Sequence, residues 1–248
     1  MTTALITGAG APQGIGMAIA RALAGQGHDL VIAATSGRIH ARAAELAAEG
    51  AWVTAFQGDL TDAAAVDRLA DLAGPVDILV NNAGMGSVSE PAALSGFLAM
   101  PMQAWRRQIE VSLTSAVLVT RAVLPGMLDR GWGRVVMMSS VTGPAVAIPG
   151  AAAYAAAKAG MMGLVRTLAL EVAGHGVTVN AIGPGWIATE ALTEAETAAA
   201  RHSPMQRAGT PAEVAACAAF LASPAASYVN GILLVVDGGN SLQEMKGP

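Results

Sequence analysis

The stretch that decides the fold is Thr7-Gly8-Ala9-Gly10-Ala11-Pro12-Gln13-Gly14-Ile15-Gly16, which begins where the aliphatic run Ala4–Thr7 ends. The residues that follow, Ile15–Gly25, have the apolar spacing of a helix. A glycine-rich turn between a strand and a helix lets backbone N–H groups approach a phosphate, and the helix N-terminus adds favourable partial charge. This context predicts a dinucleotide-binding site at the first strand-to-helix turn.

Strand and helix signals alternate along the rest of the chain. Strands that are apolar at consecutive positions are covered on both faces. The predicted strands are Ala4–Thr7, Leu30–Ala33, Trp52–Phe56, Ile78–Asn81, Arg134–Ser139, Val177–Ala181 and Ile232–Val236. The predicted helices are Ile15–Gly25, Ile39–Ala48, Ala63–Leu72, Gln103–Leu128, Ala151–Ala173 and Ala212–Leu221. The order predicts an α/β fold: a single doubly wound Rossmann domain over residues 1–248, with a parallel sheet of about seven strands and helices on both faces.

Composition excludes several classes of protein. Charged residues make up 13% and hydrophobic residues 53% of the 248 residues, the reverse of a disordered chain. The net charge is −4 without a basic run, so we expect neither nucleic acid nor an anionic membrane as partner. Charges interrupt every apolar stretch before the roughly 20 residues of a membrane span. Cys217 is the only cysteine, so no intrachain disulfide is expected, and the histidines are scattered, so no metal site is expected. We expect a soluble, cytoplasmic protein that buries apolar surface between subunits.

The residues after the second predicted strand bear on the choice of cofactor. An acidic residue in this region usually binds the ribose 2′-hydroxyl of NAD. The chain instead has Ala33-Ala34-Thr35-Ser36-Gly37-Arg38, with no acid until Glu45. Two hydroxyls and a guanidinium suit a 2′-phosphate, so NADP is favoured over NAD. The alternative is that Arg38 is a solvated residue at the start of the next helix.

Tyr154 and Lys158 form the clearest catalytic pair. Their i, i+4 spacing in a predicted helix places both side chains on one face. A nearby ammonium favours the phenolate and lowers the pKa of a tyrosine, which a general acid or base requires. Ser139 and Ser140 end the fifth predicted strand, at the sheet edge where α/β proteins bind ligands.

Taken together, these residues resemble the short-chain dehydrogenase/reductase family over nearly the whole chain, and within it carbonyl reductases similar to 3-oxoacyl-carrier-protein reductases. The matching motifs are the Thr7–Gly16 turn, Asp59-Leu60, Asn81-Asn82-Ala83-Gly84, Ser140, Tyr154-x-x-x-Lys158, Asn180-Ala181-Ile182-Gly183-Pro184-Gly185 and Asp237-Gly238-Gly239. The resemblance implies that Tyr154 exchanges the proton with the substrate oxygen and that Ser140 hydrogen-bonds this oxygen. Lys158 would bind the nicotinamide ribose and lower the pKa of Tyr154. The resemblance also implies a homotetramer.

The same resemblance, with the ribose argument above, gives a set of cofactor contacts. They are Gly8, Gln13, Gly14, Ile15, Gly16, Thr35, Ser36, Arg38, Asp59, Leu60, Asn82, Ala83, Gly84, Tyr154, Lys158, Pro184, Gly185, Ile187 and Thr189. Gln13 stands where NADP-preferring members often have a basic residue, which weighs against NADP. Thr35-Ser36 resembles the NADP-dependent 3-oxoacyl-carrier-protein reductases, which weighs for it.

Two serines near the catalytic pair require a choice. Ser140 is preferred to Ser139 because family members have glycine three residues after the catalytic serine, and Gly143 stands there. Ser112 occupies the position of the asparagine in the family's catalytic tetrad, which helps to hold a water that links the lysine to solvent. We expect the enzyme to remain active with this serine.

The predicted function is hydride transfer between NADP(H) and a ketone or secondary alcohol, with a small molecule as substrate. Residues near 186–210 would form a substrate loop, since long loops rich in proline and glycine are usually functional. Met161-Met162 would be core residues or an apolar wall for a hydrophobic substrate. One alternative is a 3-oxoacyl-carrier-protein reductase, which would need basic residues such as Arg130, Arg134 and Arg166 to dock its acidic carrier. The other is a non-catalytic NADP(H)-binding sensor.

Overall fold

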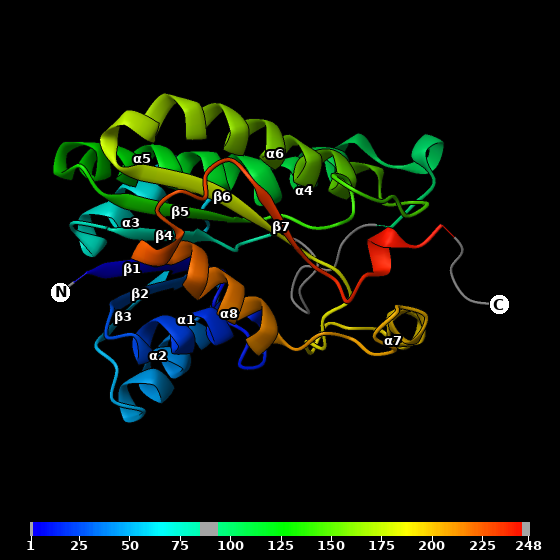
Figure 1. Cartoon of the computed structure of the whole chain (residues 1–248), viewed down its shortest axis with the longest axis horizontal. Helices are drawn as coiled ribbons and strands as arrows, with labels where there is room; N and C mark the ends of the chain where they lie inside the picture. The colour runs from blue at the N-terminus through cyan, green and yellow to red at the C-terminus, as the bar shows by residue number, and fades with distance from the viewer. Residues whose placement is uncertain (1, 85–93, 245–248) are drawn as a thin grey trace.

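The computed structural model describes residues 2–84 and 94–244. Its centre is a seven-stranded sheet in the order β3-β2-β1-β4-β5-β6-β7, in which all neighbouring strands are parallel (Figure 1). The strands are β1 Thr3–Thr7, β2 Asp29–Ala34, β3 Val53–Gln57, β4 Ile78–Asn81, β5 Gly133–Met138, β6 Val177–Pro184 and β7 Leu233–Val236. The seven predicted strands are confirmed, and the largest boundary error is at the end of β6.

Helices cover both faces of this sheet, as predicted. They are α1 Ile15–Gly25, α2 Arg38–Ala48, α3 Ala63–Ala73, α4 Met102–Ile109, α5 Ser115–Arg130, α6 Ala152–Val172, α7 Glu194–Arg201 and α8 Pro211–Ala222. Figure 1 shows α1, α2 and α8 on one face, and α3, α4, α5 and α6 on the other. The arrangement is the doubly wound Rossmann-like α/β fold.

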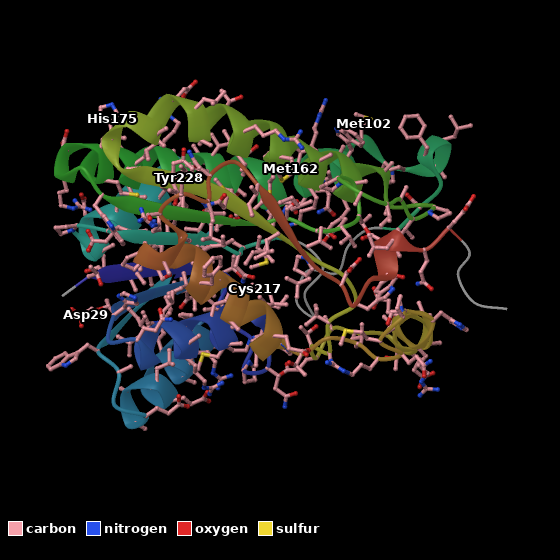
Figure 2. The ribbon with its side chains drawn as sticks, in the orientation of Figure 1. Asp29, Met102, Met162, His175, Cys217 and Tyr228 are labelled. Atoms are coloured by element: carbon pink, nitrogen blue, oxygen red, sulfur yellow. The ribbon has the colours of Figure 1, made fainter. Side chains whose placement is uncertain are left out.

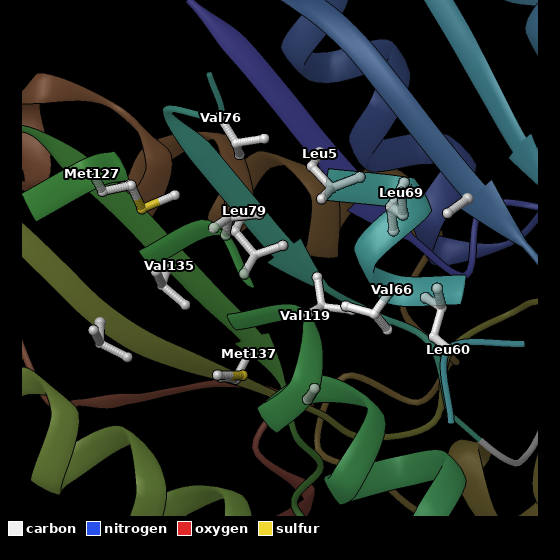
Figure 3. Packing of buried hydrophobic residues seen from close by; sticks show 14 of the residues in the cluster. Leu5, Leu60, Val66, Leu69, Val76, Leu79, Val119, Met127, Val135 and Met137 are labelled. Atoms are coloured by element: carbon white, nitrogen blue, oxygen red, sulfur yellow. The ribbon is translucent and has the colours of Figure 1, made fainter. Parts of the chain in front are cut away.

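Alternation along the strands divides the core into two halves. Leu5, Leu79 and Val135 point to the face under α3, α5 and α6, where they pack with Val119 and others (Figure 3). Their chain neighbours, such as Ile6 and Val80, point to the face under α1 and α8. Because successive side chains of a strand alternate between faces, strands that are apolar throughout can serve both halves.

The helix predicted at Gln103–Leu128 is longer and interrupted. A π-helical turn, η2 Glu110–Thr114, joins α4 to α5 within the continuous helix Met102–Arg130. This helix is long and apolar enough to cross a membrane, but it packs against α3, α6 and the sheet. A π-turn holds one extra residue per turn, which a periodicity reading over the whole segment does not register. The turn lies beside the cleft described below.

Topology locates the place where a ligand can bind. β1 pairs with β2 on one side and with β4 on the other, so the strand order reverses at β1. The connections on the two sides of this point run to opposite faces, which leaves a crevice outside the carboxyl ends of the strands. The Thr7–Gly16 turn lies at this crevice.

Candidate active site and cofactor cleft

A cavity of about 750 Å³ opens at the carboxyl ends of the strands, from the β1–α1 turn to β5 and α6. The predicted site residues that line it are Gly8, Gly14, Ile15, Thr35, Ser36, Arg38, Asp59, Leu60, Asn82, Ala83, Gly84, Ser140, Tyr154, Lys158, Pro184, Gly185, Ile187 and Thr189. Three predicted site residues do not line it. Gln13 is exposed on the solvent side of its turn, Gly16 is buried beneath the turn, and Ser112 is buried in η2.

Close backbone contacts shape the glycine turn. Gly8 has a φ of +71°, and a Cβ there would lie 2.8 Å from Ala83 Cα. A Cβ on Gly16 would lie 2.6 Å from the carbonyl oxygen of Gly8. The side-chain amide of Asn82 donates to the carbonyls of Thr7 and Gly8 at 3.1 and 3.0 Å. Gly16 therefore lets α1 approach the turn, and Asn82 fixes the turn to the end of β4.

The N-terminus of α1 is left open toward the cleft. Its N-cap, Gly14, provides no side-chain cap, whereas Thr210 and Glu213 form a complete capping box on α8. The first N–H groups of α1 and its dipole thus remain for a ligand beside Gly14 and Ile15, which line the cavity. Glycine backbone and an uncapped helix start are what a dinucleotide pyrophosphate requires. The residues present fit such a cofactor.

The end of β2 presents donors and no carboxylate. Thr35, Ser36 and Arg38 line the cavity, and Arg38 Nε donates to Ser36 Oγ at 3.3 Å. Glu45, the next acid along the chain, pairs with Arg42 instead. Within residues 2–84 and 94–244, Arg38 has no ion pair. Its guanidinium therefore stays available to an anionic group.

Asp59, after β3, is an acceptor held in a fixed position. Its Oδ1 accepts from the backbone N–H and the hydroxyl of Thr61 at 2.9 and 2.8 Å, and Arg107 lies 3.5 Å from Oδ2. Burial raises the pKa of Asp59, but the bonds from Thr61 and the charge of Arg107 outweigh it, so the net pKa is below its usual value. The carboxylate stays ionised at neutral pH.

Ser140, Tyr154 and Lys158 meet at the opposite end of the cleft. Ser140 follows β5, while α6 carries Tyr154 and Lys158 one turn apart. The Ser140 hydroxyl lies close enough to the Tyr154 phenol to lower the pKa of that phenol. Lys158 Nζ donates to the carbonyl of Met138 at 2.7 Å and lies 5.7 Å from the centre of the Tyr154 ring. A phenol, a hydroxyl and an ammonium group thus lie together on one wall of the cavity.

Burial dominates the electrostatics of this group. It lowers the pKa of Lys158 to about 8, because only 4% of the residue is exposed. It also raises the pKa of Tyr154; the Ser140 hydroxyl lowers this pKa and the carboxylate of Glu196 raises it further. The expected lowering of the Tyr154 pKa by Lys158 is therefore not found in the chain alone. The loss of hydration destabilises the phenolate by more than the neighbouring polar groups stabilise it.

The two adjacent serines face different ways. Ser139 Oγ donates to the backbone carbonyl of Lys158 at 2.9 Å and ties β5 to α6. Ser140 Oγ accepts from the N–H of Thr142 at 3.0 Å and lines the cavity with Tyr154. Gly143 has a φ of +107°, and a Cβ there would lie 2.3 Å from the carbonyl oxygen of Ala155. Glycine at this position lets the segment after Ser140 lie directly on α6.

The predicted substrate loop, 186–210, is a folded flap. Its base is closed by Ala188 N–H donating to the Gly209 carbonyl and by Gly209 N–H donating to the Trp186 carbonyl, at 2.8 and 2.9 Å. Between these anchors lies α7, which the sequence analysis did not predict although Thr193 and Glu196 form a capping box at its start. Trp186 and Glu196 line the cavity, so the flap forms part of its wall.

Sequence reasoning missed several residues of the cleft. Those lining it include Gly10, Ala11, Gly58, Thr61, Arg107, Val111, Ser115, Val146 and Ile148. Gly10 and Ala11 lie within the quoted turn, and Gly58 and Thr61 flank Asp59, so their positions carried a signal. Arg107 and Val111 gave none, because only the packing of α4 and η2 brings them to the cleft. Met161 and Met162 lie on the buried side of α6, in the core, and do not line the cavity. Figure 2 labels Met162 on this helix.

Comparisons with known proteins agree with this geometry. A family model described as enoyl-(acyl carrier protein) reductase matches residues 8–241. The oxidoreductase UcpA of Escherichia coli K12 is 43% identical over 98% of this chain and 95% of its own length. A solved protein of Beutenbergia cavernae, provisionally named an NAD(P)-dependent gluconate 5-dehydrogenase and containing NADP at low occupancy, is 36% identical, with a TM-score of 0.90 over 98% of this chain and 97% of that one.

A third match carries the other form of the cofactor. A 3-oxoacyl-[acyl-carrier protein] reductase of Brucella melitensis, solved with bound NAD, is 34% identical, with a TM-score of 0.89 over 96% of this chain and 90% of that one. The expected resemblance is confirmed. The chain belongs to the short-chain dehydrogenase/reductase family, and its relatives include named oxidoreductases and dehydrogenases that act on CH–OH groups with a nicotinamide cofactor.

Proposed function

We propose that this protein is an NADP(H)-dependent carbonyl reductase or alcohol dehydrogenase that acts on a ketone or a secondary alcohol. The observation that carries the proposal is the meeting of Ser140, Tyr154 and Lys158 on the wall of one cavity, with the tyrosine and the lysine one helical turn apart on α6. The enzyme is proposed as one cytoplasmic domain that assembles into a homotetramer.

The side chains divide the reaction between them. The bound nicotinamide supplies or accepts the hydride. Tyr154 Oη gives a proton to the carbonyl oxygen during reduction and takes it back during oxidation. Ser140 Oγ donates a hydrogen bond to the same oxygen and stabilises its developing negative charge. The raised pKa of Tyr154 keeps the phenol protonated, as reduction requires.

NADP is proposed over NAD because of the groups after β2. Arg38 and the hydroxyls of Thr35 and Ser36 line the cleft, and the next acid along the chain, Glu45, pairs with Arg42. A 2′-phosphate would gain charge-assisted hydrogen bonds there without meeting a carboxylate. Relatives hold either form of the cofactor, so the support lies in these side chains.

The substrate end of the cleft favours a neutral, largely apolar molecule. Val146, Ile148, Trp186 and Leu192 line it, together with the acidic Glu190 and Glu196 and with His202. Among the described residues of the cavity wall, the Lys and Arg side chains are Arg38 and Arg107 toward the adenosine end, and Lys158. A carboxylate-bearing substrate such as gluconate would therefore find no Arg side chain to pair with on the substrate side of Tyr154, within the described part of the wall.

A 3-oxoacyl-carrier-protein reductase is the second candidate. The apolar wall suits an acyl chain, and the Brucella melitensis relative carries that name. Two of the basic residues that we expected to dock a carrier are badly placed for it. Arg134 is 3% exposed and donates to backbone carbonyls at the start of β5, and Arg130 pairs with Asp77 at the same edge. That edge is opposite the cleft, so a carrier would have to dock on other residues.

The test is oxidation of NADPH and of NADH by the purified protein across a panel of ketones and 3-oxoacyl thioesters, with Tyr154→Phe in parallel. Ketone-dependent turnover that is faster with NADPH and lost in the variant supports the proposal. Turnover with acyl thioesters alone supports the second candidate. Tight NADPH binding without turnover on any substrate would make the protein a sensor and refute both.

A further inference from the structure

Gln108 is a buried amide whose position the reaction described so far does not explain. The residue lies in the last turn of α4 and is 1% exposed. Its Nε2 donates to Ser112 Oγ at 2.8 Å, whereas its Oε1 has no hydrogen-bond partner among the described residues. A buried carbonyl without a partner costs about 1–3 kcal/mol. An unpaired amide oxygen held at this cost indicates either a water site or a function.

The surroundings of Ser112 connect this amide to the catalytic lysine. Ser112 is fully buried in the π-turn η2, and such turns are frequent at functional sites. A Cβ built on Gly84 would lie 3.5 Å from Lys158 Nζ and 3.7 Å from Ser112 Oγ. Both polar atoms therefore flank the same point, which the missing side chain of Gly84 leaves open. The helices that carry them are in contact, since α6 packs against both α4 and η2.

Lys158 needs such a connection if it takes part in repeated turnover. Its ammonium is buried and donates to the Met138 carbonyl, which leaves it further N–H donors. Each reduction removes a proton from Tyr154 to the product, and an equal proton must return from bulk water. A chain of hydrogen bonds beside Lys158 can deliver it, whereas an apolar wall cannot.

We propose that Gln108 is a positioning residue for this proton supply, an inference that rests on the proposed function. The Gln108 amide holds Ser112 Oγ in a single orientation, and its Oε1 binds a water molecule. Amide, hydroxyl and water together form a hydrogen-bonded path on the η2 side of Lys158. Protons pass along it between solvent and the Lys158–Tyr154 pair by exchange of O–H and N–H bonds, without any other bond forming or breaking.

Kinetic measurements distinguish this role of Gln108 from a merely structural one. Replacing the Gln108 amide by an apolar group of similar shape removes its unsatisfied Oε1, which favours the fold, and its bond to Ser112 Oγ, which costs stability, so the two effects oppose each other. We expect Gln108→Met to lower kcat about tenfold while the KM for NADPH and the unfolding temperature stay the same. The solvent deuterium isotope effect on kcat should rise, because proton delivery becomes rate-limiting. Gln103→Met, at an exposed position of the same helix, is the matched control and should change none of these.

A double-mutant cycle tests the pairing with Ser112. If the two residues act as one unit, the double variant Gln108→Met/Ser112→Ala should have the same kcat as the less active of the two single variants. An asparagine at position 112 carries its own amide, so Gln108→Met should cost less than twofold in a Ser112→Asn background. Unchanged kcat and isotope effect in Gln108→Met, or losses that multiply in the double variant, would overturn the proposal.

A measurement on the enzyme without cofactor keeps this inference apart from the proposed function. The exchange rate of the Lys158 ammonium protons with water, followed by ¹⁵N NMR, should fall severalfold in Gln108→Met. An unchanged rate overturns the path even if ketones are reduced. A slowed rate in a protein that reduces no substrate supports the path and refutes the proposed function.

Discussion

The two ends of the cleft differ in burial. At one end, Tyr154 and Lys158 are enclosed between α6 and β5, where Lys158 donates to a backbone carbonyl; at the other, Thr35 and Arg38 are exposed after β2. Burial moves the pKa of both catalytic side chains, whereas the exposed donors after β2 face water, so salt screens their interactions with a ligand. The comparison teaches that the buried end sets the chemistry and that the exposed end sets the preference between cofactors. Substitutions at the buried end should therefore have large effects on turnover and stability, whereas those at the exposed end should have smaller effects on cofactor preference.

The sharpest test within the buried end is the serine pair. Ser140→Ala removes the donor to the substrate oxygen, and we expect turnover to fall about 10²–10³-fold, with a loss of about 1 kcal/mol in stability from the Thr142 N–H that it leaves unpaired. Ser139→Ala removes the bond to the Lys158 carbonyl, and we expect the free energy of unfolding to fall by about 1 kcal/mol with turnover nearly intact. Steady-state kinetics and urea unfolding measure both. A larger loss of turnover in Ser139→Ala would reverse the assignment.

The close packing of the buried end predicts the next effect. Gly143→Ala should destabilise the fold by about 2–4 kcal/mol, since the new Cβ would collide with the Ala155 carbonyl at a positive φ. Gly163→Ala, at an exposed site of α6 where a Cβ meets nothing within 4 Å, should instead stabilise it by about 0.5–1 kcal/mol. Thermal or urea unfolding of both variants gives the comparison. Equal effects would mean that the segment after Ser140 does not lie tightly on α6.

The lowered pKa of Lys158 makes stability depend on pH. Between about pH 8 and 10.5 the unfolded chain binds a proton at this lysine that the folded chain does not, so stability should rise with pH in this window. The buried charge costs about 3 kcal/mol below pH 8 and nothing above 10.5. Tyr154, whose pKa is raised, works in the opposite direction above pH 10.

Unfolding of Tyr154→Phe and of Tyr154→Phe/Lys158→Met across this range isolates the lysine. The single variant should gain stability relative to the double variant as the pH rises from 8 to 10.5. A flat difference would show that Lys158 keeps an ordinary pKa in the folded chain.

The exposed end should give the smallest effect. Arg38→Ala should raise the KM for NADPH about tenfold, or ~1.4 kcal/mol, and leave the KM for NADH and both kcat values unchanged. The loss should shrink at high salt, because the site is exposed. Arg68→Ala, on the exposed side of α3, is the control. If Arg38→Ala weakens NADH as much as NADPH, Arg38 does not read the 2′-phosphate.

Much of the fold could be predicted because its signals are local. The Thr7–Gly16 turn, the apolar strands and the helix periods each report on neighbouring residues, and β4 and α1 were placed without error. The π-turn at Glu110–Thr114 was missed since it changes the helix by a single residue. α7 was missed because the proline and glycine residues around it indicated a loop, although the capping-box residues Thr193 and Glu196 are typical of a helix start.

The site shows the same division. Residues in motifs, such as Ser140 and Asn82, lie on the cleft as predicted, whereas Arg107 and Val111 reach it only through the packing of α4 and η2. The direction of the Tyr154 pKa was wrong for a related reason. The spacing to Lys158 is visible in the sequence, but the degree of burial, which decides the sign, depends on the whole fold.

The most direct test of the division between the two ends is to measure NADPH binding and NADPH-dependent ketone reduction on one variant, Tyr154→Phe. Binding followed by nucleotide fluorescence should match the wild type within about twofold, and kcat should fall about 10³-fold or more. A variant that still turns over at a rate near that of the wild type would contradict the assignment of the proton transfer to Tyr154, and with it the account of the buried end.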